Sequence, residues 1–431
     1  MGLMYHIGLL GLGTVGGGVA QILTDPVGRH PLLKELAIAQ VGVRDRHKPR
    51  AVELDPQLFT TDLESIVTNP NIDIVVEVLG GIEPARSLIL KAIAHGKHIV
   101  TANKAVIARH GDEIFDAANA QGVYVMLEAA VAGGIPVIQA LKQSLGANRI
   151  HSVTAILNGT TNYILTRMQQ EQGEFAPILA DAQRLGYAEA DPSADIEGWD
   201  AADKIAILAS LAFGGRIRRE EVYAEGISGI TAVDITYAEK LGFRIKLLAI
   251  ARRLSGQPLE VRVHPTLVPV EHPLAGVNGV FNAILLEAEP LGQVMFYGPG
   301  AGSGATASAV VADLINIAAL LPQGRASHPL LTCQHDQWMP LLPMAEVDSR
   351  FYARVHAQDH PGVLGKLGTC FGHHNVSLES LVQIGSHNEL AEIVIVTHHV
   401  REGEFRQAMA EIAQMSDIAA VPAILRVLGT S

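Results

Sequence analysis

At 431 residues the chain is too long for one ordinary hydrophobic core, so about three domains are expected. Hydrophobic residues make up 48% and charged residues 18%, which is typical of packed globular proteins and excludes long disordered segments. The net charge of −12 argues against nucleic acid as a partner, and two cysteines, Cys333 and Cys370, form no disulfide framework and fit a reducing, cytoplasmic setting.

The N-terminal stretch 4–23 is apolar enough to imitate a signal peptide. It lacks a basic leading segment, and its glycines would weaken a membrane helix. No other apolar stretch is long enough to span a bilayer, so no membrane attachment is predicted.

A glycine-rich turn lies between a predicted strand, 5–10, and a helical run. Glycines there permit a tight turn and let the backbone approach a pyrophosphate, whose oxygens then meet free N–H groups at the start of the helix. The strand before the turn and the helix after it are what this mechanism requires, so a ligand-free turn is the poorer interpretation. The residues of the turn are Gly11, Leu12, Gly13, Thr14, Val15 and Gly16.

Strands then alternate with amphipathic helices, a pattern that predicts a doubly wound parallel sheet of the Rossmann type, in the α/β class. We expect this nucleotide-binding domain to cover residues 1–135. Its further predicted elements are strands at 35–43, 72–81, 98–102 and 123–131 and a helix at 84–96.

The residue after the second strand of such a domain selects the cofactor. An acid there binds a ribose hydroxyl of NAD, whereas an arginine accommodates the 2′-phosphate of NADP. Arg44 stands at this point, within a locally basic segment, 44–50. The basic segment favours NADP. Two alternatives stay open: Asp45 binds a ribose hydroxyl, as in NAD, or the segment is an ordinary solvated loop.

Lys104 follows the predicted strand 98–102, at the edge where doubly wound sheets bind their ligands. A cation at this edge is placed to meet a substrate carboxylate. It can equally be an ordinary residue at the start of a helix, and the residues alone leave both interpretations open.

A run of carboxylates that begins at Glu189 ends in one lysine, Lys204, before an apolar stretch. Asp200 and Lys204 are four residues apart, so they share a helix face and can pair, as surface salt bridges also do. Upstream, Glu189 and Asp195 lie in a turn, and such carboxylates suit a substrate with an ammonium group. A lysine near them stays protonated and can donate to an oxygen as a hydride arrives.

Residues 136–302 mix apolar helices with predicted strands and indicate an α+β domain for substrate binding and dimerisation. An apolar helix at 303–321 follows a glycine turn, and a stretch with prolines and histidines, 322–347, links it to the last domain. Residues 348–431 read as strand, helix, strand, strand, helix, strand, a βαββαβ pattern.

The segment 352–367 of this last domain resembles the opening of an ACT domain, a module that binds amino acids at paired interfaces. The resemblance places Asp359 and Gly362 at its ligand-binding turn. A purely structural, dimerising role is the alternative. The histidine pairs at 373–374 and 398–399 have no partners at metal-ligand spacing, so they are interpreted as solvated loop residues.

The whole chain resembles the homoserine dehydrogenase family. This family reduces L-aspartate 4-semialdehyde to L-homoserine with NADPH or NADH, in threonine, methionine and isoleucine biosynthesis. The motifs that carry the resemblance occur in family order: GLGTVG from residue 11, TANK from 101, LNGTTNYIL from 157, GYAEADPSADIEGWDAADK from 186 and GPGAGSGATASAVVADL from 298.

The resemblance implies roles for these residues. Lys204 is the general acid that protonates the aldehyde oxygen, and Lys104 is a second lysine that meets the substrate and the nicotinamide. Glu189 and Asp200 are substrate ligands, and Asp195 lines the same catalytic site. The cofactor contacts that it implies further along the chain are Gly186 and Gly302. The family's helix at 303–321 packs back on the nucleotide-binding domain.

The resemblance also implies a sodium site in the segment 127–138. Its ligands are the carboxylate of Glu128 and the backbone carbonyls of Val131, Gly133 and Ile135. One carboxylate with several carbonyls suits a hard cation. Without the resemblance the segment reads as a glycine turn after a strand.

Two other functions compete with this one. The first is another amino-acid or semialdehyde dehydrogenase of the same architecture, although nucleotide binding alone does not require the acidic turn. The second is a non-catalytic sensor of nucleotides and amino acids, which would be expected to lack one of the lysines or carboxylates. We expect a homodimer or homotetramer that threonine inhibits through the ACT domain.

Overall fold

The computed structural model describes residues 4–254, 256–324, 328–333, 335–387 and 390–429. Parts of the predicted linker, residues 325–327 and 334, therefore lie outside the described residues. The chain forms two compact units, each built from separate segments. The first unit comprises Met1–Val153, Asp203–Glu221 and Phe281–Met339, and the second comprises Thr154–Ala202, Val222–Val280 and Pro340–Ser431.

The first unit contains a six-stranded sheet in which every neighbouring pair of strands is parallel. The strand order β3-β2-β1-β4-β5-β6 reverses direction at β1, which confirms the predicted doubly wound sheet. The strands are β1 (Tyr5–Leu10), β2 (Leu36–Gly42), β3 (Phe59–Thr60), β4 (Ile74–Glu77), β5 (His98–Thr101) and β6 (Val125–Met126). The helices between them are α1 (Thr14–Thr24), α2 (Leu63–Thr68), α3 (Ala85–Ala94) and α4 (Lys104–Gln121).

One predicted strand is much shorter than expected. Residues 123–131 contain only the two-residue strand β6, and a 3₁₀-helix, Glu128–Ala130, follows it. The whole stretch is buried, so its continuous apolar character reflects burial rather than extended backbone. The short helices that follow are α5 (Val137–Gln139) and a π-helical turn, Ala140–Ser144.

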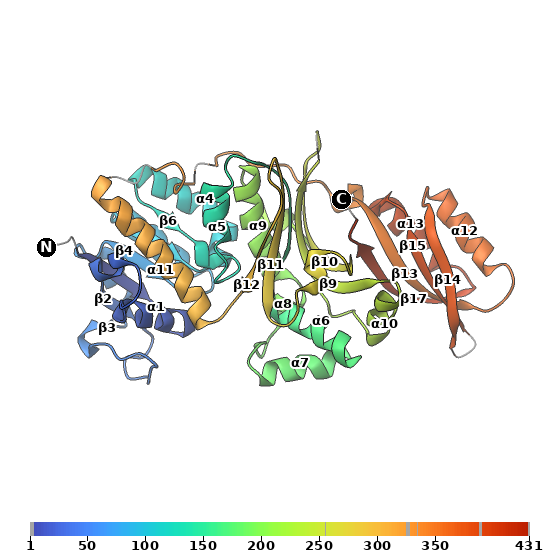
Figure 1. The fold of residues 1–431 in the computed structure, drawn as a ribbon, viewed down its shortest axis with the longest axis horizontal. Coiled ribbons are helices and arrows are strands. Elements are labelled where there is room, and N and C mark those ends of the chain that lie inside the picture. Colours follow the sequence, from blue (N-terminus) through green and yellow to red (C-terminus); the bar gives the residue numbers. More distant parts are fainter. Residues whose placement is uncertain (1–3, 255, 325–327, 334, 388–389, 430–431) are drawn as a thin grey trace. The chain divides into compact units, whose positions relative to one another are not determined.

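Helix α11 (Ser303–Leu320) returns to this sheet and packs beside α1, as Figure 1 shows in orange and blue. Gly18 permits the close approach, because a Cβ there would lie 2.8 Å from the Ser303 carbonyl oxygen. By length and composition α11 could cross a membrane, contrary to the expectation from sequence. Its buried face includes Val310, Leu314 and Ile317 and joins the core of the sheet, so it is a core helix.

Four further elements belong wholly or largely to the first unit. Strands β11 (Phe281–Glu289) and β12 (Gly292–Pro299) form an antiparallel hairpin. Helix α9 (Trp199–Phe213) contributes its residues from Asp203 onward. Strand β7 (Arg149–Ile156) contributes its residues up to Val153.

The second unit combines helices with a mixed set of strands, in which β10 pairs antiparallel with β9 and parallel with β8. Asn158 caps α6 by accepting the N–H of Thr161, and Thr231 with Asp234 forms a reciprocal capping box on α10. The helices are α6 (Gly159–Glu171), α7 (Phe175–Arg184), α8 (Ser193–Ile196) and α10 (Ala232–Lys240). The strands are β8 (Tyr223–Ala224), β9 (Phe243–Arg253) and β10 (Leu259–Pro269).

The C-terminal part of the second unit has the predicted βαββαβ order. Its strands run β17-β13-β15-β14, all antiparallel, and β17 also pairs with β10. The elements are β13 (Asp348–Gln358), α12 (Val363–His373), β14 (Leu378–His387), β15 (Leu390–Thr397), β16 (Val400–Arg401), α13 (Glu402–Ile412) and β17 (Ile418–Val427). Phe351 and Phe405 stack with ring centroids 4.1 Å apart in the core beneath α12 and α13.

Candidate functional site

The glycine-rich turn opens onto a large cleft in the first unit. Gly11, Gly13 and Thr14 line this cleft, whose volume is about 2010 Å³ with its open mouth included. Gly13 is the N-cap of α1 and offers no side-chain cap, so the first amides of the helix can serve an anion. Among the described residues, nothing lies within 4 Å of a Cβ built on Gly13, so any side chain there would occupy the cleft.

The other two predicted residues of the turn have packing roles. Gly16 is buried, and a Cβ there would lie 2.1 Å from the Gly11 carbonyl oxygen, so only glycine lets the turn close. Val15 packs against the core of the sheet. Across the cleft, the Ser303 hydroxyl donates to the Thr14 carbonyl at 2.7 Å, and the preceding residue, Gly302, caps α11 with a φ of +113°.

The basic segment after β2 also lines the cleft, with Arg44, Lys48 and Arg50 as cations and Asp45 as the one carboxylate. The Asp45 carboxylate already accepts the backbone N–H of His47 at 2.8 Å. Arg50 donates to the Lys48 carbonyl at 2.7 Å and lies over the Phe59 ring, which fixes the shape of the loop. Arg44 is exposed at the mouth of the cleft.

A buried polar network places Lys104. The fully buried carboxylate of Glu77, at the end of β4, accepts the Thr101 hydroxyl at 2.7 Å and the Leu79 N–H at 2.8 Å. Burial raises the pKa of Glu77, although these donors oppose the shift. Asn103 caps α4 and also donates to the Gly81 carbonyl at 2.7 Å, so the ends of β4 and β5 are held together where Lys104 begins α4.

A buried charge cluster ties α4 to α9. Asp203 accepts Arg109 of α4 at 3.0 Å and Arg219 at 2.6 Å, and the side chains of Asp203 and Arg219 are only 8% and 10% exposed. The residue after Asp203 is Lys204, which is half-buried. The two helices that carry Lys104 and Lys204 are therefore fixed to each other within the first unit.

The second unit brings two of the predicted carboxylates together around Asn158. The amide of Asn158 donates to Asp195 at 2.7 Å and to Asp200 at 2.9 Å. Asp195 also accepts the Thr160 hydroxyl at 3.0 Å. Asp200 is buried on the first turn of α9, one turn before Lys204. Asp195 therefore accepts one hydrogen bond at each of its two oxygens, and the Asn158 amide fixes both carboxylates.

Glu189 and Gly186 lie in the exposed turn between α7 and α8. Gln183 donates to the backbone carbonyl of Glu189 at 3.0 Å, which holds the backbone of the turn. The side-chain carboxylate of Glu189 takes no part in this hydrogen bond. Gly186 has a φ of +78°, a conformation that favours glycine.

The segment predicted to bind sodium is a buried loop of the first unit. The Glu128 carboxylate accepts the N–H groups of Ile138 at 2.9 Å and Gln139 at 2.7 Å, and burial raises its pKa. Its backbone N–H donates to Asp313, and burial, then the charge of Glu128, raises the pKa of Asp313 to about 7. Val131, Gly133 and Ile135 are buried in the same loop, and a Cβ on Gly133 would lie 2.5 Å from the Gly300 carbonyl oxygen.

The predicted regulatory turn lies before α12. Gly362 caps this helix with a φ of +99°, and Asp359 is exposed. Gly362 and Lys366 line a hollow of about 1020 Å³, its open side included. Lys366 is paired with Asp417, which lowers the pKa of Asp417.

Several residues of these arrangements were not singled out from the sequence, among them Glu77, Asp203, Asn158 and Ser303. Asn158 lies inside a motif of the family and directly precedes a helix, so capping preference was a usable signal. Glu77 and Asp203 acquire their roles from partners that are distant in the chain, Thr101 and Arg109, and local pattern gives no signal for such partners.

Comparison with protein-family models gives three matches along the chain. Residues 11–128 match "Homoserine dehydrogenase, NAD binding domain", residues 136–315 match "Homoserine dehydrogenase", and residues 351–417 match "ACT domain". The acidic turn lies within the second match. The first match covers the nucleotide-binding sheet from β2 to β6, and the third covers the C-terminal domain from within β13 to α13.

Curated relatives and solved structures that resemble this chain belong to the same family as the matching models. A homoserine dehydrogenase from Synechocystis sp. is 61% identical over 98% of this chain and 99% of its own length, and one from Neisseria gonorrhoeae is 47% identical over 94% of each. A crystal structure of a homoserine dehydrogenase from Thiobacillus denitrificans is similar with a TM-score of 0.92 and 45% identity, covering 98% of each chain. A hyperthermophilic archaeal homoserine dehydrogenase in complex with NADPH is similar at a TM-score of 0.62 and 27% identity, over 75% of this chain and 100% of that one.

Proposed function

Since the chain belongs to the homoserine dehydrogenase family, as an NAD(P)-dependent oxidoreductase with an ACT domain, we propose which of its residues perform the reaction. The reaction interconverts L-aspartate 4-semialdehyde and L-homoserine. The reduced nicotinamide supplies the hydride that adds to the aldehyde carbon. The protein must hold the amino-acid part of the substrate and protonate the aldehyde oxygen.

Lys204 is proposed as the proton donor. The observation that carries this role is its place on α9, directly after Asp203, whose bonds to Arg109 and Arg219 fix that turn of the helix. A lysine held in one position can donate to an oxygen that gains negative charge as the hydride arrives, and can take the proton back in the reverse direction. Lys104 is proposed to meet the substrate and the nicotinamide from the N-terminus of α4, where the Glu77 and Asn103 network holds it.

Glu189 and Asp200 are proposed to bind the substrate, with Asp195 lining the same catalytic site. Support comes from the Asn158 amide, which donates to both Asp195 and Asp200 and holds their carboxylates in fixed orientations. Two carboxylates held close together suit a substrate with an ammonium group. Carboxylates at this turn favour an amino acid over a simple aldehyde or keto acid.

Lys204→Met tests the proton donor, because it keeps the bulk of the side chain and removes the proton. We expect kcat to fall about 10²- to 10⁴-fold, the usual contribution of one acid–base group, with NADP binding nearly unchanged. Lys91→Met is the matched control, since Lys91 is a helical lysine paired with Glu64 on the surface of the same unit. Wild-type kcat in Lys204→Met would remove Lys204 from this role.

The cofactor is proposed to be NADP in preference to NAD. Its phosphates would lie against Gly11, Gly13, Thr14 and the amides at the start of α1, with Gly302 at the opposite wall, and Val15 and Gly16 complete the turn. The cations Arg44, Lys48 and Arg50 that line the cleft suit a 2′-phosphate. Gly186 is a further proposed contact.

A sodium ion is proposed at Glu128, with the carbonyls of Val131, Gly133 and Ile135. The donor set fits a hard cation, because the Glu128 carboxylate is buried and a cation would offset the cost of its charge. The ion would hold the loop that runs from β6 to α5. Exchange of sodium for choline should lower the melting temperature, and Glu128→Gln should remove this difference.

Threonine is proposed as the effector, at the turn with Asp359 and Gly362. Point variants test this better than removal of the domain, because β17 pairs with β10 and buried Arg426 binds Glu225 at 2.7 Å. Deletion of residues 348–431 would strip these contacts from the remainder of the second unit.

The assembly is proposed to be a homodimer or homotetramer in the cytoplasm. Phe281 and Tyr297 stack at 5.1 Å on the β11–β12 hairpin, and both are exposed, which is typical of a surface that another copy covers. Light scattering of the wild type and Tyr297→Ser tests this.

The division into consecutive domains, 1–135, 136–302, 322–347 and 348–431, likewise stays a prediction.

A further inference from the structure

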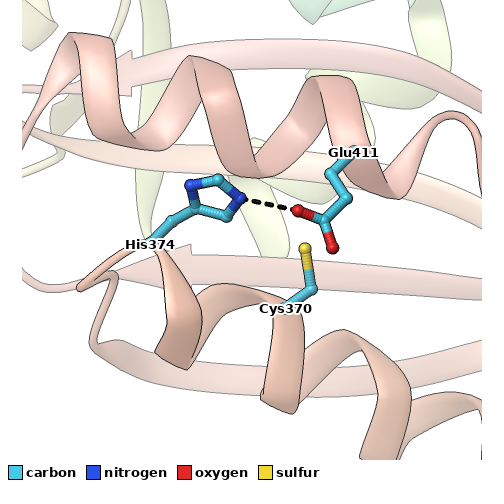
Figure 2. Close-up of side chains that lie close together, drawn as sticks. All are labelled: Cys370, His374 and Glu411. Atoms are coloured by element: carbon cyan, nitrogen blue, oxygen red, sulfur yellow. Dashed lines mark hydrogen bonds and ion pairs between the residues drawn. The ribbon is translucent and has the colours of Figure 1, made fainter.

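Three side chains with different metal-binding chemistry converge between the helices of the ACT domain. Cys370 and His374 come from α12 and its C-cap, one turn apart, and Glu411 comes from the last turn of α13. Figure 2 shows all three directed into the space between the helices. His374 is half-buried here rather than a solvated loop residue, so the expectation from sequence was wrong for this histidine.

The distances already approach those of a coordination site. One potential ligand atom from each residue lies within 4.8 Å of the other two, and His374 Nε2 lies 2.8 Å from a Glu411 carboxylate oxygen. In a tetrahedral zinc site, with bonds of about 2.0–2.3 Å, neighbouring ligand atoms lie about 3.3–3.7 Å apart. Small side-chain rotations therefore suffice to surround one ion.

The ligand types select the class of metal. A thiolate with an imidazole suits zinc and other borderline or soft ions, whereas magnesium and calcium require oxygen ligands. The burial of the three residues is graded, with Cys370 buried and the Glu411 side chain 53% exposed. This gradient leaves an entry path and room for a water molecule as the fourth ligand.

The Cys370 thiol lies close to the Glu411 carboxylate. Its S–H points to the Ala408 carbonyl at 3.7 Å. A divalent cation would supply the positive charge that a thiolate beside a carboxylate needs.

We propose that Cys370, His374 and Glu411 bind one zinc ion that joins α12 to α13. On binding, the thiol releases its proton to solvent and forms a Zn–S bond. His374 gives up the Nε2 proton that it donates to Glu411 and takes the tautomer with the proton on Nδ1, so its Nε2 lone pair and one Glu411 oxygen complete the protein ligands. The hydrogen bond between these two residues is replaced by their bonds to zinc. Since Gly362 and Lys366 lie on the N-terminal side of α12, the ion would also stiffen the helix that borders the regulatory turn.

The test uses the full-length protein after treatment with a chelator. Titration calorimetry with ZnCl₂ should give one site per chain, and CoCl₂ should give a thiolate-to-cobalt charge-transfer band in the near ultraviolet. MgCl₂ should give neither. Cys370→Ser should abolish the cobalt band, and His374→Gln and Glu411→Gln should weaken zinc binding by more than about 100-fold, beyond the effect of losing an outer partner of a ligand.

Two matched variants control for general effects. Cys333→Ser removes the other cysteine, and His399→Gln breaks a pair of the same kind, His399 with Asp348 at 2.6 Å, in the same domain. Both should bind zinc as the wild type does. His374→Gln changes a half-buried residue, so it keeps the test valid if Cys370→Ser fails to fold. The proposal is overturned if the wild type binds no stoichiometric zinc, if His374→Gln binds with unchanged affinity, or if Cys333→Ser removes the cobalt band.

Discussion

The nucleotide-binding sheet and the ACT domain both place a glycine at the N-cap of a helix that borders a hollow. At Gly13 the hollow is lined by helix amides and by three cations, Arg44, Lys48 and Arg50. At Gly362 the nearest cation of the hollow, Lys366, is already paired with Asp417. The positive charge of the cleft at Gly13 therefore indicates an anionic ligand, whereas the hollow at Gly362 does not indicate which ligand it binds. Similar backbone geometry indicates a ligand only where the surrounding charges remain available to it.

The largest effect on stability is expected at the buried charge cluster of Asp203 in the first unit. Asp203→Asn keeps the shape and removes the negative charge that faces Arg219, whose side chain is 10% exposed. Removal of one partner from a buried pair costs about 3–5 kcal/mol in the free energy of unfolding. Urea denaturation of the variant should show this loss.

Asp116→Asn is the control, because Asp116 also pairs with an arginine, Arg216, but its side chain is 59% exposed. An exposed pair contributes about 0–1 kcal/mol. Equal losses in both variants would contradict the assignment of Asp203 to a buried structural cluster.

A smaller effect is expected at the nucleotide-binding cleft. It tests whether the cations of this cleft bind the ligand, in contrast to Lys366 at the ACT turn. Arg44→Ala should raise the Kd of NADP about 10- to 100-fold, because a charge-assisted hydrogen bond is lost, and should leave the Kd of NAD nearly unchanged. Fluorescence titration with each dinucleotide measures both values. Arg46→Ala is the control, since Arg46 donates to the Pro56 carbonyl rather than lining the cleft. Equal losses for both cofactors in Arg44→Ala would place Arg44 away from the ribose.

The smallest effect is expected at the ACT turn. Asp359→Ala removes an exposed side chain that the reaction does not use, so the uninhibited rate should stay at the wild-type value. Loss of about 1 kcal/mol of coupling would raise the threonine concentration for half inhibition about fivefold. Rate measurements over a threonine series test this. A wild type that millimolar threonine leaves fully active would instead favour a purely structural ACT domain.

The nucleotide-binding fold was predictable because its signals are local. The turn at 11–16, the alternation of strands and helices, and the helix at 303–321 each depend on neighbouring residues, and the structure reproduces them with small shifts in their ends. The stretch 123–131 was mispredicted because a buried turn and a buried strand are equally apolar.

The clusters that link distant segments were not predictable in this way. Asp203 lies beside a residue that the sequence did single out, yet its partner Arg109 is 94 positions away. Cys370 and His374 are visibly four residues apart, but Glu411 joins them only because α13 packs beside α12. Their partners become evident only when the helices pack together.

The most direct test of the proposed chemistry is homoserine-dependent reduction of NADP and NAD by the full-length wild type and by Lys204→Met, in parallel. We expect the wild type to reduce NADP with homoserine, to use NAD less efficiently, and to lose about 10²- to 10⁴-fold in kcat when Lys204 becomes Met. A wild type that reduces neither cofactor with homoserine, or a Lys204→Met variant as fast as the wild type, would contradict the proposed reaction and its proton donor.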